Sequence, residues 1–471
     1  MINKSALRTV LVHASISGCG FDSFGKGDLG ESTWANLGLC YISAYAKSKG
    51  FWVDLIDLRR LKGWSEFKAS LKDLKPAVVG ISMMSVDFNY VIKCIDLIKE
   101  VNEEIRIVIG GAHPTLMLEE IINNPKIDHI ILGEGEISFT GLLQDILERK
   151  ENIKRVFRGV TPELDELPFA DRNLYKSFEQ PIFEGLALPF ATIIASRGCV
   201  YNCGFCQPAE KIIFGDKFRR RSVESVIKEL VFLKEKYDFQ SLMIHDDCFT
   251  EDKEWVSRFC QAYQAEGFNQ PFVCQARADH VCKNEFTIKE MKEAGLKMLI
   301  IGFESGNQRV LNFLNKGTTI EQNYKAAEIC KKYGIDIWAN YMLGIPTETK
   351  QEAKDTVKMI KTIKPQHYSP AFFTPCPGSS LYNYCIKNNL SLIVNHDDYR
   401  RNPVGKKIQG VDYYFLNDLL SESMGFTKKK RFILRFFRHK ILVNFKKHLK
   451  KNIFGRIVVD NLKQRLGYGQ K

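Results

Sequence analysis

The sequence lacks an uninterrupted apolar run of about 18 residues, the length that a bilayer-spanning helix needs. Its first residues, MINKSALRTVLVHAS, lack the pattern of a secretory signal peptide and pass directly into a strand-like stretch. Internal repeats and low-complexity segments are also absent. We therefore expect a cytoplasmic protein, and 471 residues are enough for two or three domains with cores of their own.

A disulfide framework is not expected, although the chain has 13 cysteines. They are scattered along a large chain without a secretion signal, which favours reduced thiols and a metal site. The exception to the scatter is SRGCVYNCGFC (196–206), which places three cysteines close together: Cys199, Cys203 and Cys206.

Negative charge is nearly absent from the C-terminus. Residues 427–471 contain fifteen Lys and Arg and one acid, whereas residues 1–426 carry a net charge of about −1. Apolar residues recur there at spacings of three and four: Leu434, Phe437, Ile441, Phe445, Leu449 and Ile453. Such a basic amphipathic helix is typical of contact with an anionic membrane, which would add a peripheral location at the inner membrane surface. The alternative is a helix whose apolar stripe packs on the protein. Nucleic acid is not expected, because the aromatics lie on the apolar stripe.

The first 150 residues alternate short apolar runs with helical patterns. The runs predicted as strands are 9–15, 51–58, 77–85, 105–111 and 129–136, with helices over 34–50 and 89–102. This alternation predicts an α/β domain (1–150) with a doubly wound parallel sheet. Such sheets bind ligands beyond the carboxyl ends of their strands, where small residues gather here.

A second αβ series follows residues 151–190, whose prolines and weak periodicity predict a linker. Its strand-like runs are 191–197, 241–247, 272–278, 297–305, 336–344 and 367–373. Six such units predict a partial (β/α)6 barrel over residues 191–385. Residues 386–471 remain as a C-terminal region that contains the basic helix.

The spacing of the three cysteines suggests a metal centre with an open position. Four thiolates would close the coordination shell of zinc or of an iron–sulfur cluster, and three leave one position free. The loop also follows the first barrel strand, where barrel enzymes place their chemistry. Buried structural cysteines, or zinc with a distant fourth ligand, are the alternatives. The flanking Gly198 and Gly204 favour the open cluster.

Cys199-x-x-x-Cys203-x-x-Cys206, with Phe205 before the last cysteine, resembles the signature of radical S-adenosylmethionine (SAM) enzymes. The resemblance implies that the cysteines hold a 4Fe-4S cluster and that SAM chelates its open iron. An external one-electron reductant then drives the cleavage of SAM to a 5′-deoxyadenosyl radical. Later motifs match in the same order and imply further SAM contacts, from HDDCF, QARAD, GFESG and MLGIPTE: Phe205, Asp246, Asp247, Arg277, Glu304, Ser305, Gly344 and Glu348.

The N-terminal domain resembles the cobalamin-binding module that precedes this barrel in one large subfamily, through GGAHPT (110–115) and GEGE (133–136). The resemblance implies that cobalamin is lined by Ser82, Ser85, Gly110, Gly111, His113, Gly133, Glu134 and Gly135. One departure concerns the loop after the first strand, which has no histidine beyond Ala14. Axial ligation of cobalt by a histidine of that loop is therefore not expected.

Together the resemblances imply a cobalamin-dependent radical SAM enzyme that methylates an unactivated carbon of a small-molecule or lipid-linked substrate. One SAM would methylate cobalamin, and a second would supply the radical that removes a substrate hydrogen before methylcobalamin donates its methyl group. One alternative keeps the scaffold but catalyses cyclisation, rearrangement or carbon–carbon coupling. Another is a methylthiotransferase, whose second cluster would need Cys19, Cys40 and Cys94.

Overall fold

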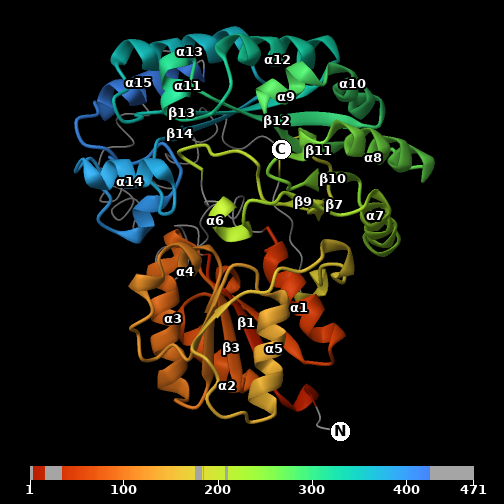
Figure 1. Cartoon of the computed structure of the whole chain (residues 1–471), viewed down its shortest axis with the longest axis vertical. Coiled ribbons are helices and arrows are strands. Elements are labelled where there is room, and N and C mark those ends of the chain that lie inside the picture. Colours follow the sequence, from red (N-terminus) through yellow and green to blue (C-terminus); the bar gives the residue numbers. More distant parts are fainter. Residues whose placement is uncertain (1–3, 16–33, 176–182, 184, 207–209, 425–471) are drawn as a thin grey trace, which may run out of the picture. The chain divides into compact units, whose positions relative to one another are not determined.

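The computed structural model describes residues 4–15, 34–175, 183, 185–206 and 210–424. Met1–Val411 form one compact unit and Asp412–Lys471 a second, in which α15 (Tyr413–Ser423) is described. The predicted basic helix of residues 427–471 lies outside the described residues. The first unit contains two six-stranded sheets, called sheet A and sheet B below (Figure 1).

Sheet A is parallel throughout and has the strand order β2-β1-β3-β4-β5-β6. Its strands are β1 (Thr9–His13), β2 (Val53–Asp57), β3 (Val78–Ser82), β4 (Arg106–Gly110), β5 (His129–Leu132) and β6 (Val156–Arg158). The predicted doubly wound parallel sheet is confirmed. The chain passes from β1 to β2 on one side and then crosses to β3 on the other side of β1, so the crevice where such sheets bind ligands lies between β1 and β3.

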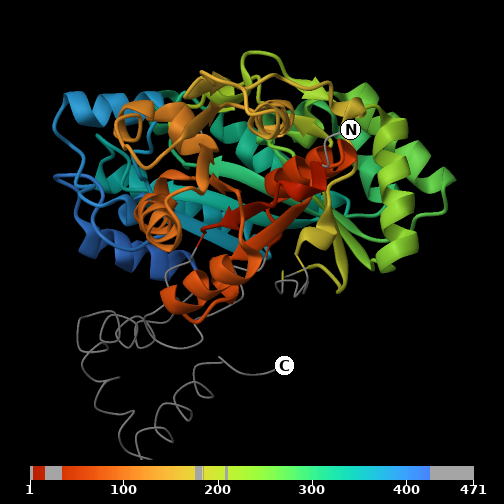
Figure 2. The same ribbon diagram turned by 90° about the horizontal axis from the view of Figure 1, so that it is seen from below.

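Helices cover both faces of sheet A (Figures 1 and 2). On one face lie α1 (Leu37–Ser48) and α5 (Glu136–Leu147), and on the other α2 (Trp64–Leu74) and α3 (Phe88–Val101). Alternate residues of β1 therefore enter different cores: Leu11 packs with the α1 side, whereas Val10 and Val12 pack with the α2 side. This burial on both faces explains why β1 reads as a continuous apolar run.

The segment predicted as a linker, residues 151–190, contributes to sheet A and its core. β6 pairs with β5, and Leu164, Leu167 and Leu174 join the core under α1 and α5. The three side chains of β6 are half-buried or exposed. So short an edge strand gives no periodic signal, which is why the sequence pattern missed it.

Sheet B is also parallel, with its strands in sequential order from β7 to β14. They are β7 (Phe190–Ile193), β10 (Ser241–Ile244), β11 (Phe272–Ala276), β12 (Leu296–Glu304), β13 (Asp336–Leu343) and β14 (His367–Phe372). β7 and β14 form its edges, so the predicted partial barrel is confirmed. A small antiparallel pair, β8 (Ser196–Arg197) and β9 (Arg219–Arg220), follows β7.

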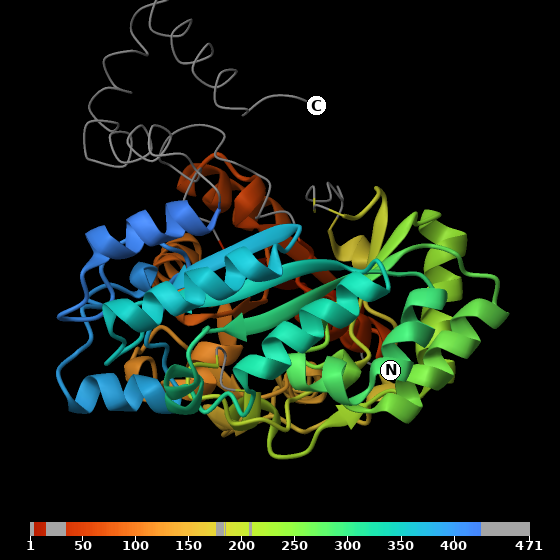
Figure 3. The same cartoon turned by 90° about the horizontal axis from the view of Figure 1, so that it is seen from above.

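Helices alternate with the strands of sheet B and cover its outer face, as Figure 3 shows for the turquoise helices α12 and α13. The longer helices are α7 (Val223–Tyr237), α8 (Lys253–Ala265), α10 (Glu285–Glu293), α12 (Ile320–Lys332) and α13 (Lys350–Ile363). The shorter ones are α6 (Glu210–Phe214), α9 (Ala278–Lys283), α11 (Gln308–Phe313) and α14 (Ser380–Lys387). None of the helices described in the structure is long and apolar enough to cross a membrane.

Capping boxes define where two of these helices begin. In α13, the Thr349 side chain accepts from the backbone N–H of Glu352, and the Glu352 carboxylate accepts from the backbone N–H of Thr349. Thr319 and Gln322 form the same box at α12. Each box satisfies two backbone donors that the first turn would otherwise leave free, and each N-cap side chain stabilises its helix by about 1 kcal/mol.

Candidate functional site

A cavity of about 360 Å³ lies at the carboxyl ends of the sheet A strands. Sheet A lines it with Leu11 of β1, with the end of β3 and with the loops that follow β4 and β5. The barrel lines it with polar groups from the segments after β7 and β10 and from α6: Ser196, Arg197, Glu210, His245 and Asp247. The cavity therefore lies where both αβ series carry their loops, the usual location of ligands in such folds.

Six of the eight residues predicted to line cobalamin line this cavity: Ser82, Gly110, Gly111, Gly133, Glu134 and Gly135. Gly111 has a φ of +103°, and a Cβ there would lie 2.9 Å from backbone atoms of Met83. Only glycine allows the loop after β4 to run this close to the end of β3. Ser85 and His113 are not among the lining residues, since His113 Nδ1 lies 3.1 Å from Ser85 Oγ in a cluster treated below.

Two arginines from the β8–β9 pair neutralise the acidic loop after β5. Arg197 contacts Glu134 and Glu136 at 2.7 Å each, and Arg219 contacts the second oxygen of Glu134 at 2.5 Å. Arg197, Glu134 and Glu136 are all buried, and the Arg197 guanidinium also lies over the Tyr41 ring. Glu134 therefore faces the cavity with its charge already paired.

The three-cysteine loop follows β8 and is anchored by backbone hydrogen bonds. The Gly204 N–H donates to the Leu314 carbonyl at 2.8 Å, and the Leu381 N–H donates to the Gly204 carbonyl at 2.9 Å. A Cβ at Gly204 would approach Leu381 to 3.1 Å, so this position must stay small. The barrel thus fixes the middle of the loop, while its three cysteines form no disulfide and are partly exposed.

The sulfur atoms of the loop are not all as close together as the ligands of one zinc ion. Sulfur ligands of one tetrahedral zinc lie about 3.8 Å apart, given Zn–S bonds of about 2.3 Å. Among the residues that the structure describes, Cys199, Cys203 and Cys206 do not form a group with all ligand atoms within 4.8 Å of one another. Burial, followed by the nearby Glu210, raises the pKa of the Cys206 thiol to about 12. A bound metal must therefore drive the deprotonation of this thiol.

Asp246 and Asp247, at the end of β10, have different surroundings. Asp246 is fully buried and accepts from the Ala195 N–H at 2.7 Å and from the Ser196 hydroxyl, so it fixes the backbone that leads into the cysteine loop. Asp247 lines the cavity and is hydrogen-bonded to Glu210. Burial raises the pKa of both carboxyls of this pair, and the charge of Asp247 raises that of Glu210 further. The pair therefore retains a proton near neutral pH.

Arg277 connects the cysteine loop to the third barrel strand. Its guanidinium lies 3.5 Å from the centroid of the Tyr201 ring, and Nη1 lies 3.7 Å from Cys203 Sγ. Nε donates to Asp279 at 3.0 Å, and Nη2 donates to the Lys316 carbonyl at 2.7 Å. The cysteine loop therefore has a fixed guanidinium beside the sulfur of Cys203.

Glu304 and Phe205, both predicted SAM contacts, meet at Lys316. The Lys316 Nζ lies 3.1 Å from Glu304 Oε1 and 5.6 Å from the centroid of the Phe205 ring. Glu304 ends β12 with a φ of +62°, a rare conformation for a residue with a side chain. The adjacent Ser305 is completely buried, and its hydroxyl lies 3.1 Å from that of Thr356 in α13. Its predicted contact with the ribose of SAM stays a prediction.

Comparison with known proteins finds a separate family for the N-terminal domain and for the barrel. Residues 30–143 match the model of the B12 binding domain, and residues 193–360 match that of the Radical SAM superfamily. An uncharacterized methyltransferase of Pyrococcus horikoshii is 29% identical over 430 residues, with 88% of this chain and 90% of the relative covered. The chain therefore carries the two domains of the radical SAM enzymes that have a B12-binding domain.

Two further relatives show the range of this family. The anaerobic magnesium-protoporphyrin IX monomethyl ester cyclase of Rubrivivax gelatinosus is 25% identical, with 80% of this chain and 69% of the relative covered. The solved structure of OxsB, a cobalamin-dependent SAM radical enzyme with aqua-cobalamin and SAM bound, aligns with a TM-score of 0.67 at 17% identity. It covers 98% of this chain and 75% of that protein, and it supports the assignment of the fold.

A methylthiotransferase with a second cluster on the N-terminal domain would need the cysteines of that domain to lie close enough together to ligate one cluster. Cys40 is buried in the core under α1, whereas Cys94 is buried in the core under α3. These cores lie on opposite faces of sheet A, so the two thiols cannot ligate one cluster. Cys19, the third residue of that hypothesis, lies outside the described residues.

Sequence reasoning missed Glu210, Arg197, Arg219 and Lys316. Arg197 lies two residues before Cys199, so its place beside the cysteine motif was a usable signal. Glu210 and Lys316 belong to no motif, and only the tertiary structure brings them to Asp247 and Glu304.

Glu348 provides a pH-dependent test of the loop after β13 in this radical SAM enzyme. Its Oε2 accepts from the Gly344 N–H at 2.7 Å, and burial raises the pKa of its carboxyl from 4.5 to about 7. The folded state therefore holds a proton that the unfolded chain loses above pH 4.5. We expect stability to fall as the pH rises from 5 to 7, by about 2 kcal/mol, and Glu348→Gln to remove this slope.

Thermal unfolding of the parent protein and of Glu348→Gln between pH 5 and 8 measures this change in stability. Glu285→Gln is the matched control, because hydrogen bonds from Lys332 and Tyr333 hold the pKa of this partly exposed carboxyl below its usual value. Equal pH slopes in the parent protein and Glu348→Gln would contradict the prediction.

Proposed function

We propose that this chain is a cobalamin-dependent radical SAM methyltransferase that acts on an unactivated carbon of a small molecule. The observation that carries the proposal is the shared cavity. Glycine loops of the B12-binding domain line it together with Asp247 and Glu210, whose charges act on the thiols of the cysteine loop. A methyl donor held by the glycine loops and a radical source held by the cysteine loop would therefore reach the same substrate.

The cofactors would supply the radical and the methyl group, and the chain would position them in a dry site. Cys199, Cys203 and Cys206 would hold the 4Fe-4S cluster and leave one iron for SAM. Apolar side chains of both domains line the cavity and exclude water from it: Leu11, Ile81, Val108, Ile131, Phe139, Ile194 and Phe214. The Glu210–Asp247 pair shares one proton, so it places one negative charge at the site and not two.

Cyclisation without methyl transfer is the second candidate, and the similarity to the Rubrivivax gelatinosus cyclase favours it. Anaerobic turnover of the holoenzyme with methyl-labelled SAM and fractionated cell extract separates the two. We expect the label to enter a product together with release of 5′-deoxyadenosine. Release of 5′-deoxyadenosine and consumption of substrate without label in the product would instead establish a non-methylating reaction.

The partners in this proposal are an external one-electron reductant and an anionic membrane surface. Partial exposure of the three cysteines allows a reductant to approach the cluster. Residues 427–471 carry a net charge of +14, and each basic residue near an acidic lipid surface contributes about 1 kcal/mol of attraction. Such a location suits a lipid-linked substrate.

Deletion of residues 427–471 tests the membrane contact. We expect the truncated protein to stop sedimenting with anionic liposomes while it still cleaves SAM, because the barrel motifs end before residue 386. Binding of the full chain should weaken with salt, since the Debye length is about 8 Å at physiological ionic strength. Neutral liposomes are the control. Aggregation or loss of the cluster after truncation would show that the tail belongs to the folded core.

A further inference from the structure

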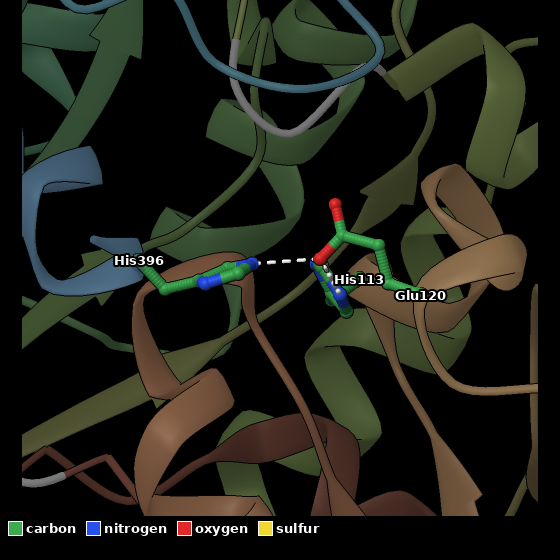
Figure 4. A group of neighbouring side chains, drawn as sticks. All are labelled: His113, Glu120 and His396. Carbon is green, nitrogen blue, oxygen red and sulfur yellow. Dashed lines mark hydrogen bonds and ion pairs between the residues drawn. The ribbon is translucent and has the colours of Figure 1, made fainter. Parts of the chain in front are cut away.

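Three side chains far apart in the sequence converge outside the cavity. His113 comes from α4 (Ala112–Leu116), Glu120 from the 3-10 turn η5 (Leu118–Glu120) and His396 from the 3-10 turn η9 (His396–Tyr399). Figure 4 shows both imidazoles directed at the Glu120 carboxylate. Glu120 Oε2 lies 2.7 Å from His396 Nε2 and 3.6 Å from His113 Nε2, and one ligand atom of each residue lies within 4.8 Å of the others.

His113 presents a buried nitrogen that has no hydrogen-bond partner among the described residues. The side chain is completely buried, and Nδ1 lies 3.1 Å from Ser85 Oγ. When Nδ1–H donates to this hydroxyl, Nε2 carries a lone pair directed at Glu120, and no donor satisfies it. Burial, with repulsion from His396, lowers the pKa of His113 to about 4, so the ring is neutral at physiological pH. A neutral imidazole oriented by a second hydrogen bond is the form that binds metals.

His396 is also held in place before any ligand arrives. Its ring stacks on Phe88, with centroids 4.0 Å apart and an angle of 13° between the planes. Asn395, the N-cap of η9, accepts from the Asp397 N–H at 3.2 Å and receives a hydrogen bond from Asn89 in α3. The ring position therefore follows from packing against the B12-binding domain.

The donor set matches a known metal preference. Two imidazoles and one carboxylate form the three-ligand set of many catalytic zinc sites, which leave a fourth position for water. Ligand atoms on one tetrahedral zinc lie about 3.3 Å apart, and the separations of 2.7 and 3.6 Å bracket this value. The side chains of Glu120 and His396 are 27% and 24% exposed, so an ion has a path from solvent.

We propose that His113, Glu120 and His396 bind a divalent transition-metal ion, with Zn²⁺ as the probe of choice and water as the fourth ligand. Binding replaces the His396–Glu120 hydrogen bond, and the proton of His396 moves from Nε2 to Nδ1. The ion ties η9, which follows the barrel, to η5 of the B12-binding domain, and it is separate from the cysteine loop and the cavity.

Equilibrium dialysis of the full-length holoprotein against buffered Zn²⁺, followed by metal analysis, tests the site. The loaded cluster occupies the three cysteines, so zinc taken up in addition to the iron reports other ligands. We expect one zinc per chain, and Glu120→Gln and His396→Ala to weaken zinc binding by at least about 100-fold. Glu119→Gln, which changes the adjacent carboxylate outside the cluster, is the matched control and should bind as the parent protein does.

Two further measurements distinguish a real site from a hydrogen-bonded contact. X-ray absorption at the zinc edge should show only nitrogen and oxygen ligands near 2.0–2.1 Å, with imidazole and no sulfur at 2.3 Å. Zinc should raise the melting temperature of the parent and of Glu119→Gln but not that of Glu120→Gln. Absence of zinc uptake, sulfur ligation, or equal binding by Glu120→Gln would overturn the proposal. Glu120→Gln is nearly isosteric and keeps the test valid should His396→Ala fail to fold.

Discussion

Replacement of Cys203 by alanine should abolish the cluster and lower SAM cleavage by at least about 10⁶-fold, the acceleration expected of even a modest enzyme. Arg277 Nη1 lies 3.7 Å from the sulfur of Cys203. The loop cannot shift to bring another of its own thiols to this position, because Gly204 is hydrogen-bonded to Leu314 and Leu381. Anaerobically reconstituted parent protein should contain about four irons per chain, and Cys199→Ala and Cys206→Ala should resemble Cys203→Ala.

Iron and acid-labile sulfide analysis, together with the yield of 5′-deoxyadenosine, measures this loss. Cys282→Ala is the matched control, since Cys282 is also a partly exposed free thiol but lies on α9 and donates to the Gln322 carbonyl. It should keep both iron and activity. A Cys203→Ala protein that retains its iron and cleaves SAM would show that the three cysteines do not hold the cluster.

Replacement of Arg197 by methionine should lower the free energy of unfolding by about 3–5 kcal/mol. Methionine keeps the length of the apolar stem but leaves Glu136 without its partner and Glu134 with only Arg219. Both carboxylates are buried, and removing one member of a buried ion pair leaves a charge without compensation. Because Arg197 and Glu134 also line the cavity, uptake of hydroxocobalamin should fall as well.

Denaturant unfolding of the apoprotein measures the change in stability. Arg258→Met, at an exposed position on α8, is the control and should stay within about 0.5 kcal/mol of the parent protein. A similarly small change for Arg197→Met would mean that the two carboxylates are solvated in solution or take up protons instead.

Much of the architecture follows from local patterns in the sequence. The central strands of both sheets are buried on both faces, so each appears as a short apolar run, and the helices between them show spacings of three and four. The predicted strands at residues 9–15 and 241–247 contain β1 and β10. The cysteine motif was equally readable, because its ligands lie on one short loop. β6 escaped detection because three residues at a sheet edge carry no period.

The tertiary structure decided which polar groups share an environment. Glu210 gained a role only when α6 brought it to Asp247, and Glu134 received its charge partners from a strand pair more than 60 residues away. His113 had been predicted to line the cobalamin cavity, yet its side chain meets Glu120 and a histidine 276 residues beyond that carboxylate. Sequence spacing determines which side chains lie close together on one loop or one strand, because the backbone fixes the distance between them. Contacts between elements depend on how helices and strands pack, and no local pattern encodes that packing.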